Sequence, residues 1–236
     1  MSKLPAPPAD GFCAEAWAHT ADLQQAIVEH PFNAALTDGT LDRDRFAFYI
    51  VQDARYLVGF AQALAAAATR SDNAEDAAFL AGASQGALVE ERRLHAGYVA
   101  EFGLTDAETA GVDTSPSCLA YTSYLRATAL TEPYPVLLAA ILPCFWVYQH
   151  VGTTILEATG GAEDHPYRAW IQTYADDEFA EAVLTARDLT DRVAKGADAE
   201  TRQRMLDAFT RATEYEWLFW NSAWIKEEWQ TSRFLN

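Results

Sequence analysis

Residues 136–148 read VLLAAILPCFWVY and form the longest apolar run of the chain. A membrane-spanning helix needs about 20 such residues, so this run is too short to cross a bilayer. It also lacks the alternation of apolar and polar residues that is typical of a half-buried strand. We therefore expect the run to lie in a buried core helix that extends over residues 134–159.

The other segments also favour helices. Alanine is abundant, glycines fall mostly between segments with helical periodicity, and no stretch alternates for long enough to indicate a strand. The sequence thus predicts an all-α protein built as a single helical bundle. The expected helices cover residues 12–29, 42–70, 74–102, 117–130, 134–159, 166–173, 176–195 and 199–228.

The length of the chain is typical of one domain. Its 236 residues, with a mass of 26.0 kDa, can bury roughly 70% of the unfolded surface around a single core. We expect one domain over residues 1–236, in which residues 1–11 are a flexible N-terminal extension. The proline-rich start of the chain has no continuous apolar stretch, so we expect no signal peptide.

Charge and cysteine content limit the possible partners. Seventeen basic and thirty-four acidic residues give a net charge of −17, which repels nucleic acid and anionic membrane surfaces. Cys13, Cys118 and Cys144 are too few for a disulfide framework and too dispersed for a zinc site. These features favour a reducing compartment and a cytoplasmic protein.

Two carboxylates fall where helical periodicity places core residues. Asp53 lies in FYIVQDARYLVGF (48–60) and Glu216 in EYEWLFWNSAW (214–224), and apolar residues recur around both at helical spacing. An ionised carboxylate in an apolar setting is costly unless it is paired or protonated. Either acid could be functional, or it could be a structural acid satisfied by helix ends or by Arg55.

Cys144 follows Pro143 inside the apolar run. A proline within a helix removes one backbone N–H and presses on the carbonyl four residues earlier, so we expect a kink that opens space in front of the thiol. The alternative is that Cys144 is a small packing residue. Tyr148 and Tyr56 share helix faces with Cys144 and Asp53, as expected for an aromatic-walled pocket or an ordinary core.

Metal and haem sites are the competing interpretations. Glu91 and His95 share a helix face, but di-metal bundles use two Glu-x-x-His motifs and this chain has none, so we expect a structural pair. His19 could ligate haem iron in principle. The remaining histidines, in His30–Pro31, His150 and His165–Pro166, are expected in turns or on the surface.

Five segments together resemble the TenA / thiaminase II family, with a match from about His30 to Trp229. The resemblance implies an all-α bundle of the haem-oxygenase-like type, a homotetramer without cofactor or metal, and a small-molecule pyrimidine as substrate. The segments are HPFNAALTDGTLDRDRFAFYIVQDARYL, SPSCLAYTSYL, LLAAILPCFWVYQHVG, HPYRAWIQTYADDEF and EYEWLFWNSAWIKEEW.

The resemblance implies hydrolysis of 4-amino-2-methylpyrimidine compounds in thiamin salvage, by addition of a cysteine to the ring. The compounds are aminomethylpyrimidine, thiamin or both. Cys144 matches the family nucleophile, Glu216 the catalytic acid and Asp53 the carboxylate that holds the aminopyrimidine edge. The substrate-binding tyrosines of the family match Tyr56, Tyr121, Tyr148 and Tyr174.

Two features depart from the family pattern and bear on substrate choice. Arg55 places a positive charge beside Asp53, and Trp217 and Trp224 make the last helix bulky. Arg55 motivates an alternative function, a non-catalytic module that binds or senses a pyrimidine. A haem-binding protein of the same fold is a further alternative.

Overall fold

The computed structural model describes residues 10–102 and 111–234, with side chains for residues 10–89 and 111–234. All regular elements in these ranges are helices, which confirms the predicted all-α class. The helices are α1 (Phe12–His19), α2 (Ala21–Val28), α3 (Pro31–Thr37), α4 (Arg43–Thr69), α5 (Ala74–Phe102), α7 (Pro116–Thr131), α8 (Tyr134–Thr159), α9 (Arg168–Ala175), α10 (Asp177–Ala194), α11 (Ala199–Ile225) and the 3-10 turn η1 (Ser232–Phe234).

The contacts between residues divide the chain into two compact units. The first unit comprises the residues up to Leu41 and Pro133–Trp217. The second comprises Asp42–Glu132 and the residues from Leu218 onward. Both units are therefore discontinuous in sequence. The single domain expected over residues 1–236 stays a prediction, and residues 1–9 of the expected N-terminal extension lie outside the described chain.

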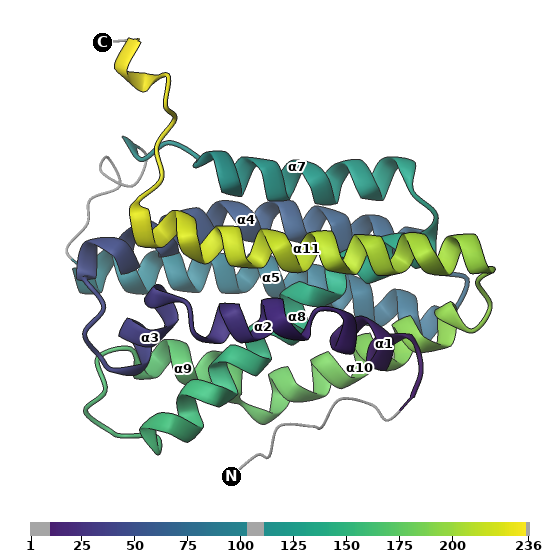
Figure 1. Cartoon of the computed structure of the whole chain (residues 1–236), viewed down its shortest axis with the longest axis horizontal. Coiled ribbons are helices and arrows are strands. Elements are labelled where there is room, and N and C mark those ends of the chain that lie inside the picture. The colour runs from purple at the N-terminus through teal and green to yellow at the C-terminus, as the bar shows by residue number, and fades with distance from the viewer. Residues whose placement is uncertain (1–9, 103–110, 235–236) are drawn as a thin grey trace. The chain divides into compact units, whose positions relative to one another are not determined.

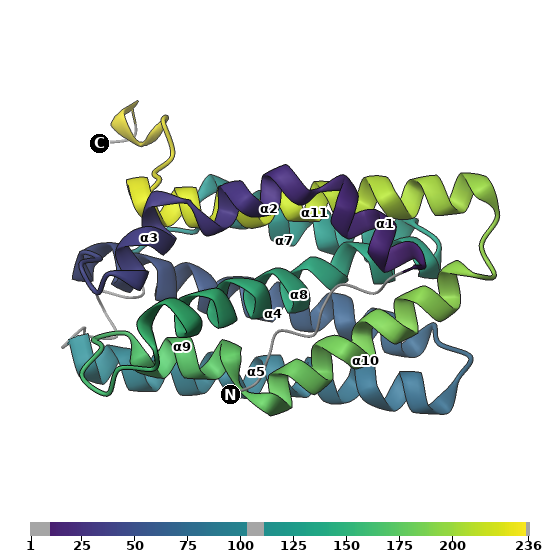
Figure 2. The ribbon, with the colours of Figure 1, turned by 60° about the horizontal axis from the view of Figure 1, so that its bottom comes forward.

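Helix α8 is the core of the first unit, where it packs against α2, α3, α9 and α10 (Figure 2). It has the length and composition of a membrane span, but 94% of its most apolar 18-residue stretch is buried inside the protein, as the sequence predicts for a core helix. The helix continues through Pro143 without a break. Because proline has no N–H, the carbonyl of Ala139 receives no helical hydrogen bond from position 143.

The predicted helix over 12–29 is two helices, α1 and α2. The chain breaks at Thr20, which has φ −104° and ψ 14°. The Thr20 hydroxyl donates to the carbonyl of Ala16 at 2.9 Å and accepts from the Gln24 amide at 2.8 Å. A threonine hydroxyl that bonds to the preceding turn often bends a helix, but it does not by itself end one, because Thr153 makes the same bond within α8. Helical periodicity alone does not reveal the break.

Helix α3 was absent from the sequence prediction, which gave His30–Pro31 a turn or surface role. Pro31 is instead the first residue of α3, a position where its missing N–H costs nothing. His30 is buried and its Nδ1 atom accepts from the Phe32 N–H at 3.1 Å. His150, which was also expected in a turn or on the surface, is not in a turn but lies half-buried within α8.

In the second unit, α4 packs between α5 and α7 (Figure 1). Asp42 caps α4 by accepting from the Asp44 N–H at 2.9 Å. A Cβ atom at Gly59 would lie 2.8 Å from Cγ2 of Thr122, so glycine at this position lets α4 and α7 approach closely. This approach brings the facing residues of the two helices into contact.

Candidate active site

The seven residues expected at the site are all buried, and they fall into one group in each unit. Asp53 is 2% exposed, Glu216 1% and Cys144 9%. Carboxylates are almost never this buried without a partner or a function. The second unit holds Asp53, Tyr56 and Tyr121, and the first holds Cys144, Tyr148, Tyr174 and Glu216.

Asp53 and Tyr56 lie one turn apart on α4, next to Tyr121 of α7. The rings of Tyr56 and Tyr121 have centroids 4.8 Å apart, and Phe219 of α11 lies 5.5 Å from Tyr56. Asp53 and Tyr56 are three residues apart on α4, so this ring cluster shares a side of the helix with the Asp53 carboxylate. A flat heterocycle with an amino edge matches this combination of aromatic surface and hydrogen-bond acceptor.

Cys118 lies on α7 close to Asp53. Burial raises the pKa of the Cys118 thiol, with a smaller contribution from the negative charge of Asp53, to about 12. Its sulfur donates to the carbonyl of Gln52 at 3.5 Å. Cys118 therefore stays a protonated thiol at neutral pH and is a poor nucleophile.

Arg55 and Gln52 connect α4 to the segment before α7. The Arg55 guanidinium donates to the carbonyl of Val112. The Gln52 amide donates to the carbonyl of Asp113 and accepts from the Ser115 N–H, both at 2.9 Å. Gln52 is fully buried, but helical spacing does not single it out, because it is adjacent to Asp53 and so points to a different side of α4.

In the first unit, Tyr148 of α8 packs against Tyr174 of α9 with 4.9 Å between ring centroids. Cys144, Tyr148 and Gly152 recur every four residues and thus share one face of α8. A Cβ atom at Gly152 would lie 2.7 Å from Cβ of Tyr174, so the glycine allows α9 to reach this face. The tyrosine pair therefore lies on the Cys144 side of α8.

Glu216 lies near the end of the part of α11 that belongs to the first unit. Phe209, two turns earlier on the same face, contacts Trp146 of α8 with 6.3 Å between centroids. This contact places the inner face of α11 against α8. Trp217 packs against His30 at 5.3 Å, which accounts for part of the bulk of this helix.

A second buried cysteine in the first unit has a structural setting. Burial raises the pKa of the Cys13 thiol, and the neighbouring Asp191 adds to this effect. Cys13 donates its N–H to Asp191 at 2.8 Å. The nearby Arg187 guanidinium lies 4.4 Å above Trp146, whose ring stacks on Trp17 at 4.1 Å, so this cluster joins α1, α8 and α10.

The competing metal and haem interpretations gain no support from the described residues. Within the part of the chain that the structure describes, no three His, Cys, Asp or Glu side chains are grouped to hold a metal ion. The side chains of Glu91 and His95 lie outside the described residues. His19 is exposed at the end of α1, unlike a buried haem ligand.

Comparisons with known proteins agree with this architecture. An aminopyrimidine aminohydrolase of Bacillus subtilis is 32% identical over 94% of this chain and 93% of its own length. A TenA homologue from P. horikoshii superposes with a TM-score of 0.82 at 25% identity, covering 92% of this chain and 99% of that one.

A domain with a heme oxygenase-like fold from Shewanella denitrificans gives a TM-score of 0.73 at 14% identity, covering 90% of this chain and 91% of that one. This likeness confirms the expected haem-oxygenase-like fold. The model of the TENA/THI-4/PQQC family matches residues 17–226. With a match over most of its length, this chain belongs to the TENA/THI-4/PQQC family.

Proposed function

We propose that this protein is an aminopyrimidine aminohydrolase that hydrolyses 4-amino-2-methylpyrimidine compounds in thiamin salvage. The observation that carries the proposal is the 32% identity to the Bacillus subtilis aminopyrimidine aminohydrolase, which extends over 94% of the chain. The buried carboxylates and tyrosine pairs support it, because they offer aromatic surface and a few polar groups to a small heterocycle.

In the proposed mechanism, Cys144 is the nucleophile and Glu216 the general acid. The Cys144 sulfur bonds to a carbon of the pyrimidine ring, and the displaced electron pair moves to a ring nitrogen, which takes a proton. We assign this proton transfer to Glu216, whose carboxyl group is 1% exposed. Asp53 accepts hydrogen bonds from the amino edge of the ring.

The leaving group departs in the second half of the reaction. The electron pair of the ring expels ammonia, or the thiazole in the case of thiamin, from the carbon attached to position 5. The oxygen of water then bonds to this carbon and gives one proton to the Glu216 carboxylate. Departure of the Cys144 thiolate restores the aromatic ring, and the ring nitrogen releases its proton to solvent. One C–N bond is exchanged for one C–O bond, water is consumed, and no oxidant or reductant is required.

Arg55, the residue that motivated a non-catalytic alternative, has a hydrogen-bond partner within the protein. The Arg55 guanidinium donates to the carbonyl of Val112, in the segment that precedes α7. Its charge is thus engaged by the protein backbone. A pyrimidine sensor would bind the aminopyrimidine without releasing ammonia, so turnover separates the two functions.

The setting of the enzyme is also part of the proposal. Three free cysteines and a net charge of −17 support a reducing, cytoplasmic compartment without nucleic acid as partner. We propose a homotetramer on the basis of the family resemblance. Sedimentation at several protein concentrations tests the tetramer, and a monomer at all of them would refute it.

The decisive experiment is ammonia release from aminomethylpyrimidine by the purified chain. We expect turnover to hydroxymethylpyrimidine, with a loss of roughly a thousandfold or more in Cys144→Ala because the covalent step is removed. Cys13→Ala is the matched control, since it removes another buried thiol of the same unit and should retain turnover. Equal activity of Cys144→Ala and the parent would refute the nucleophile, and no turnover by the parent would refute the function.

A further inference from the structure

The turn that follows α11 touches the segment that opens α7. We call residues 226–229 the C-terminal clasp. Glu227 accepts from the backbone N–H of Ser117 at 2.9 Å, and the Trp229 indole donates to the carbonyl of Thr114 at 2.9 Å. Both contacts lie within the second unit.

The clasp completes the hydrogen bonding at the first turn of α7. Pro116 is the first residue of this helix and has no N–H to satisfy. The next N–H, of Ser117, goes to Glu227, and the third, of Cys118, goes to the Ser115 hydroxyl at 3.1 Å. A carboxylate at this place is also favoured by the positive end of the helix dipole.

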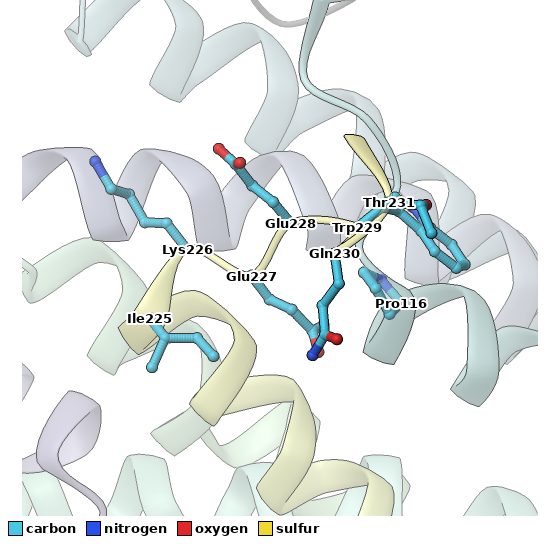
Figure 3. Close-up of a pocket in the computed structure, with 8 residues that line it drawn as sticks. All are labelled: Pro116, Ile225, Lys226, Glu227, Glu228, Trp229, Gln230 and Thr231. Carbon is cyan, nitrogen blue, oxygen red and sulfur yellow. The ribbon is translucent and has the colours of Figure 1, made fainter. Parts of the chain in front are cut away.

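The turn after α11 directs the Glu227 side chain toward the Ser117 N–H. Lys226 has φ 47°, in the left-handed region, and the Glu227 N–H donates back to the carbonyl of Ser222 at 2.8 Å. This turn ends α11 at Ile225, earlier than the predicted end at 228. In Figure 3 the Glu227 side chain points in the opposite direction to those of Lys226 and Glu228, on the wall of an open pocket of about 720 Å³.

The segment held by the clasp is also fixed from α4. Gln52 binds Asp113 and Ser115, and Arg55 binds Val112, so the segment has backbone contacts to both neighbours. The two α4 residues that make these contacts flank Asp53 in the sequence. The opening of α7 is thus tied to the same stretch of α4 that carries Asp53.

Tyr121 and Cys118 lie in the first two turns of α7, directly after the clasped residues. Tyr121 packs on Tyr56 at 4.8 Å, and Cys118 bonds to the Gln52 carbonyl. A shift of the first turn of α7 therefore moves Tyr121 relative to Tyr56 and Asp53. In a packed core, such shifts are transmitted to neighbouring side chains and not absorbed locally.

We propose that Glu227 is a positioning residue for the aminopyrimidine-binding residues of the second unit: the C-terminal clasp holds the first turn of α7 so that Tyr121 stays against Tyr56. This inference rests on the proposed function for its effect on substrate. It assigns Glu227 no contact with the substrate. Its effect is on affinity, because the residues that it positions hold the ring, whereas Cys144 and Glu216 carry out the chemistry.

The test compares Glu227→Ala, Glu227→Gln and the control Glu228→Ala in the full chain. Glu228→Ala removes the same charge from an exposed neighbour whose side chain points away. We expect Glu227→Ala to raise KM for aminomethylpyrimidine roughly tenfold, the size of one lost charge-assisted hydrogen bond, with kcat within about twofold. Glu227→Gln should recover most of the affinity, because its amide oxygen still accepts from Ser117. Glu228→Ala should match the parent.

A second readout does not depend on substrate. Cys118 is fully buried at the clasped turn, so its modification by a thiol reagent, located by mass spectrometry, reports release of α7. Glu227→Ala should speed modification of Cys118 at least about tenfold. Trp229→Phe, which removes the indole donor and part of the ring system but leaves Glu227 in place, should give a smaller increase.

Each outcome decides the inference. Faster Cys118 modification with an unchanged KM, or equal loss of kcat and affinity in all variants including Glu228→Ala, would overturn the positioning role. An unchanged modification rate in Glu227→Ala would overturn the clasp itself. A parent chain that shows no turnover would refute the proposed function, while the Cys118 readout would still judge the clasp.

Discussion

His150 is a half-buried histidine on α8 whose ring meets the edge of Trp17 at a centroid distance of 5.3 Å. Burial lowers its pKa below the usual value of 6.5, and the charge of Glu157 opposes this shift less strongly. The unfolded chain therefore binds a proton at pH values where the folded chain does not.

We predict that acidification below about pH 6.5 destabilises the protein in part through His150. The folded pKa is lower than the unfolded one, so stability is lost as pH falls from 6.5 toward the folded pKa, by at most about 1.4 kcal/mol per pH unit. His150→Gln should reduce this slope. Urea unfolding at pH 7.5, 6.5 and 5.5 measures it, and parallel slopes for both proteins would contradict the prediction.

The sequence identified the buried acids but not all of their neighbours. Helical spacing was enough to place Asp53 and Glu216 on inward faces, and both are almost fully buried. The partners of Gln52 lie more than 60 positions away, and Ser117 is 110 positions from Glu227. No local sequence pattern indicates such pairs, because they depend on which distant segments the fold brings together.

At the scale of elements, two glycines determine how closely helices approach. Gly152 faces Tyr174, and Gly59 faces Thr122. In the sequence both resemble any glycine in a helix, where the residue costs about 1 kcal/mol relative to alanine. Their close contacts explain why that cost is tolerated in α8 and α4.

We predict that Gly152→Ala destabilises the protein by roughly 1–3 kcal/mol and weakens substrate binding. The added Cβ would lie 2.7 Å from Cβ of Tyr174 and 3.0 Å from its carbonyl carbon, so the backbone of α9 must move. Denaturant unfolding and KM report the two effects. Gly86→Ala is the control, because nothing lies within 4 Å of its added Cβ, and it should stabilise by roughly 0.5–1 kcal/mol.

We predict that Lys226→Gly stabilises the protein by up to about 1 kcal/mol. Lys226 occupies the left-handed region where glycine is favoured, and its ion pair with Asp44 at 3.8 Å is exposed and contributes little. Gly160 occupies the same left-handed conformation at the end of α8, with φ 61°, so Gly160→Ala should destabilise the protein. Thermal unfolding of each variant measures the change in stability.

The helix boundaries show what local sequence can predict. Residues 134–159 were predicted and observed as one helix, because a long apolar segment with a clear start and an ending glycine leaves little choice. The break at Thr20 and the short helix α3 were missed, since apolar periodicity does not mark a break within a helix and α3 has only seven residues. The end of α11 was misplaced for a related reason, a left-handed lysine.

At the scale of the whole molecule, the dominant electrostatic feature is the net charge of −17. Self-repulsion of like charges destabilises a compact state, and salt screens it.

We predict that raising NaCl from 20 mM to 500 mM increases the melting temperature, by roughly 2–4 °C for each kcal/mol recovered in a chain of this size. Differential scanning calorimetry with NaCl and KCl measures the effect, and both salts should act alike if screening is the cause. A melting temperature that falls with either salt would contradict this prediction.

The division of the chain bears on how it matures during synthesis. The first unit requires residues up to Trp217, and the second requires residues from Leu218 onward. A ribosome that has made only α4, α5 and α7 therefore exposes helices whose closing partner, Glu227, has not yet been translated. Both units therefore stay incomplete until α11 has been translated, and premature termination near position 220 would leave the second unit open to proteolysis.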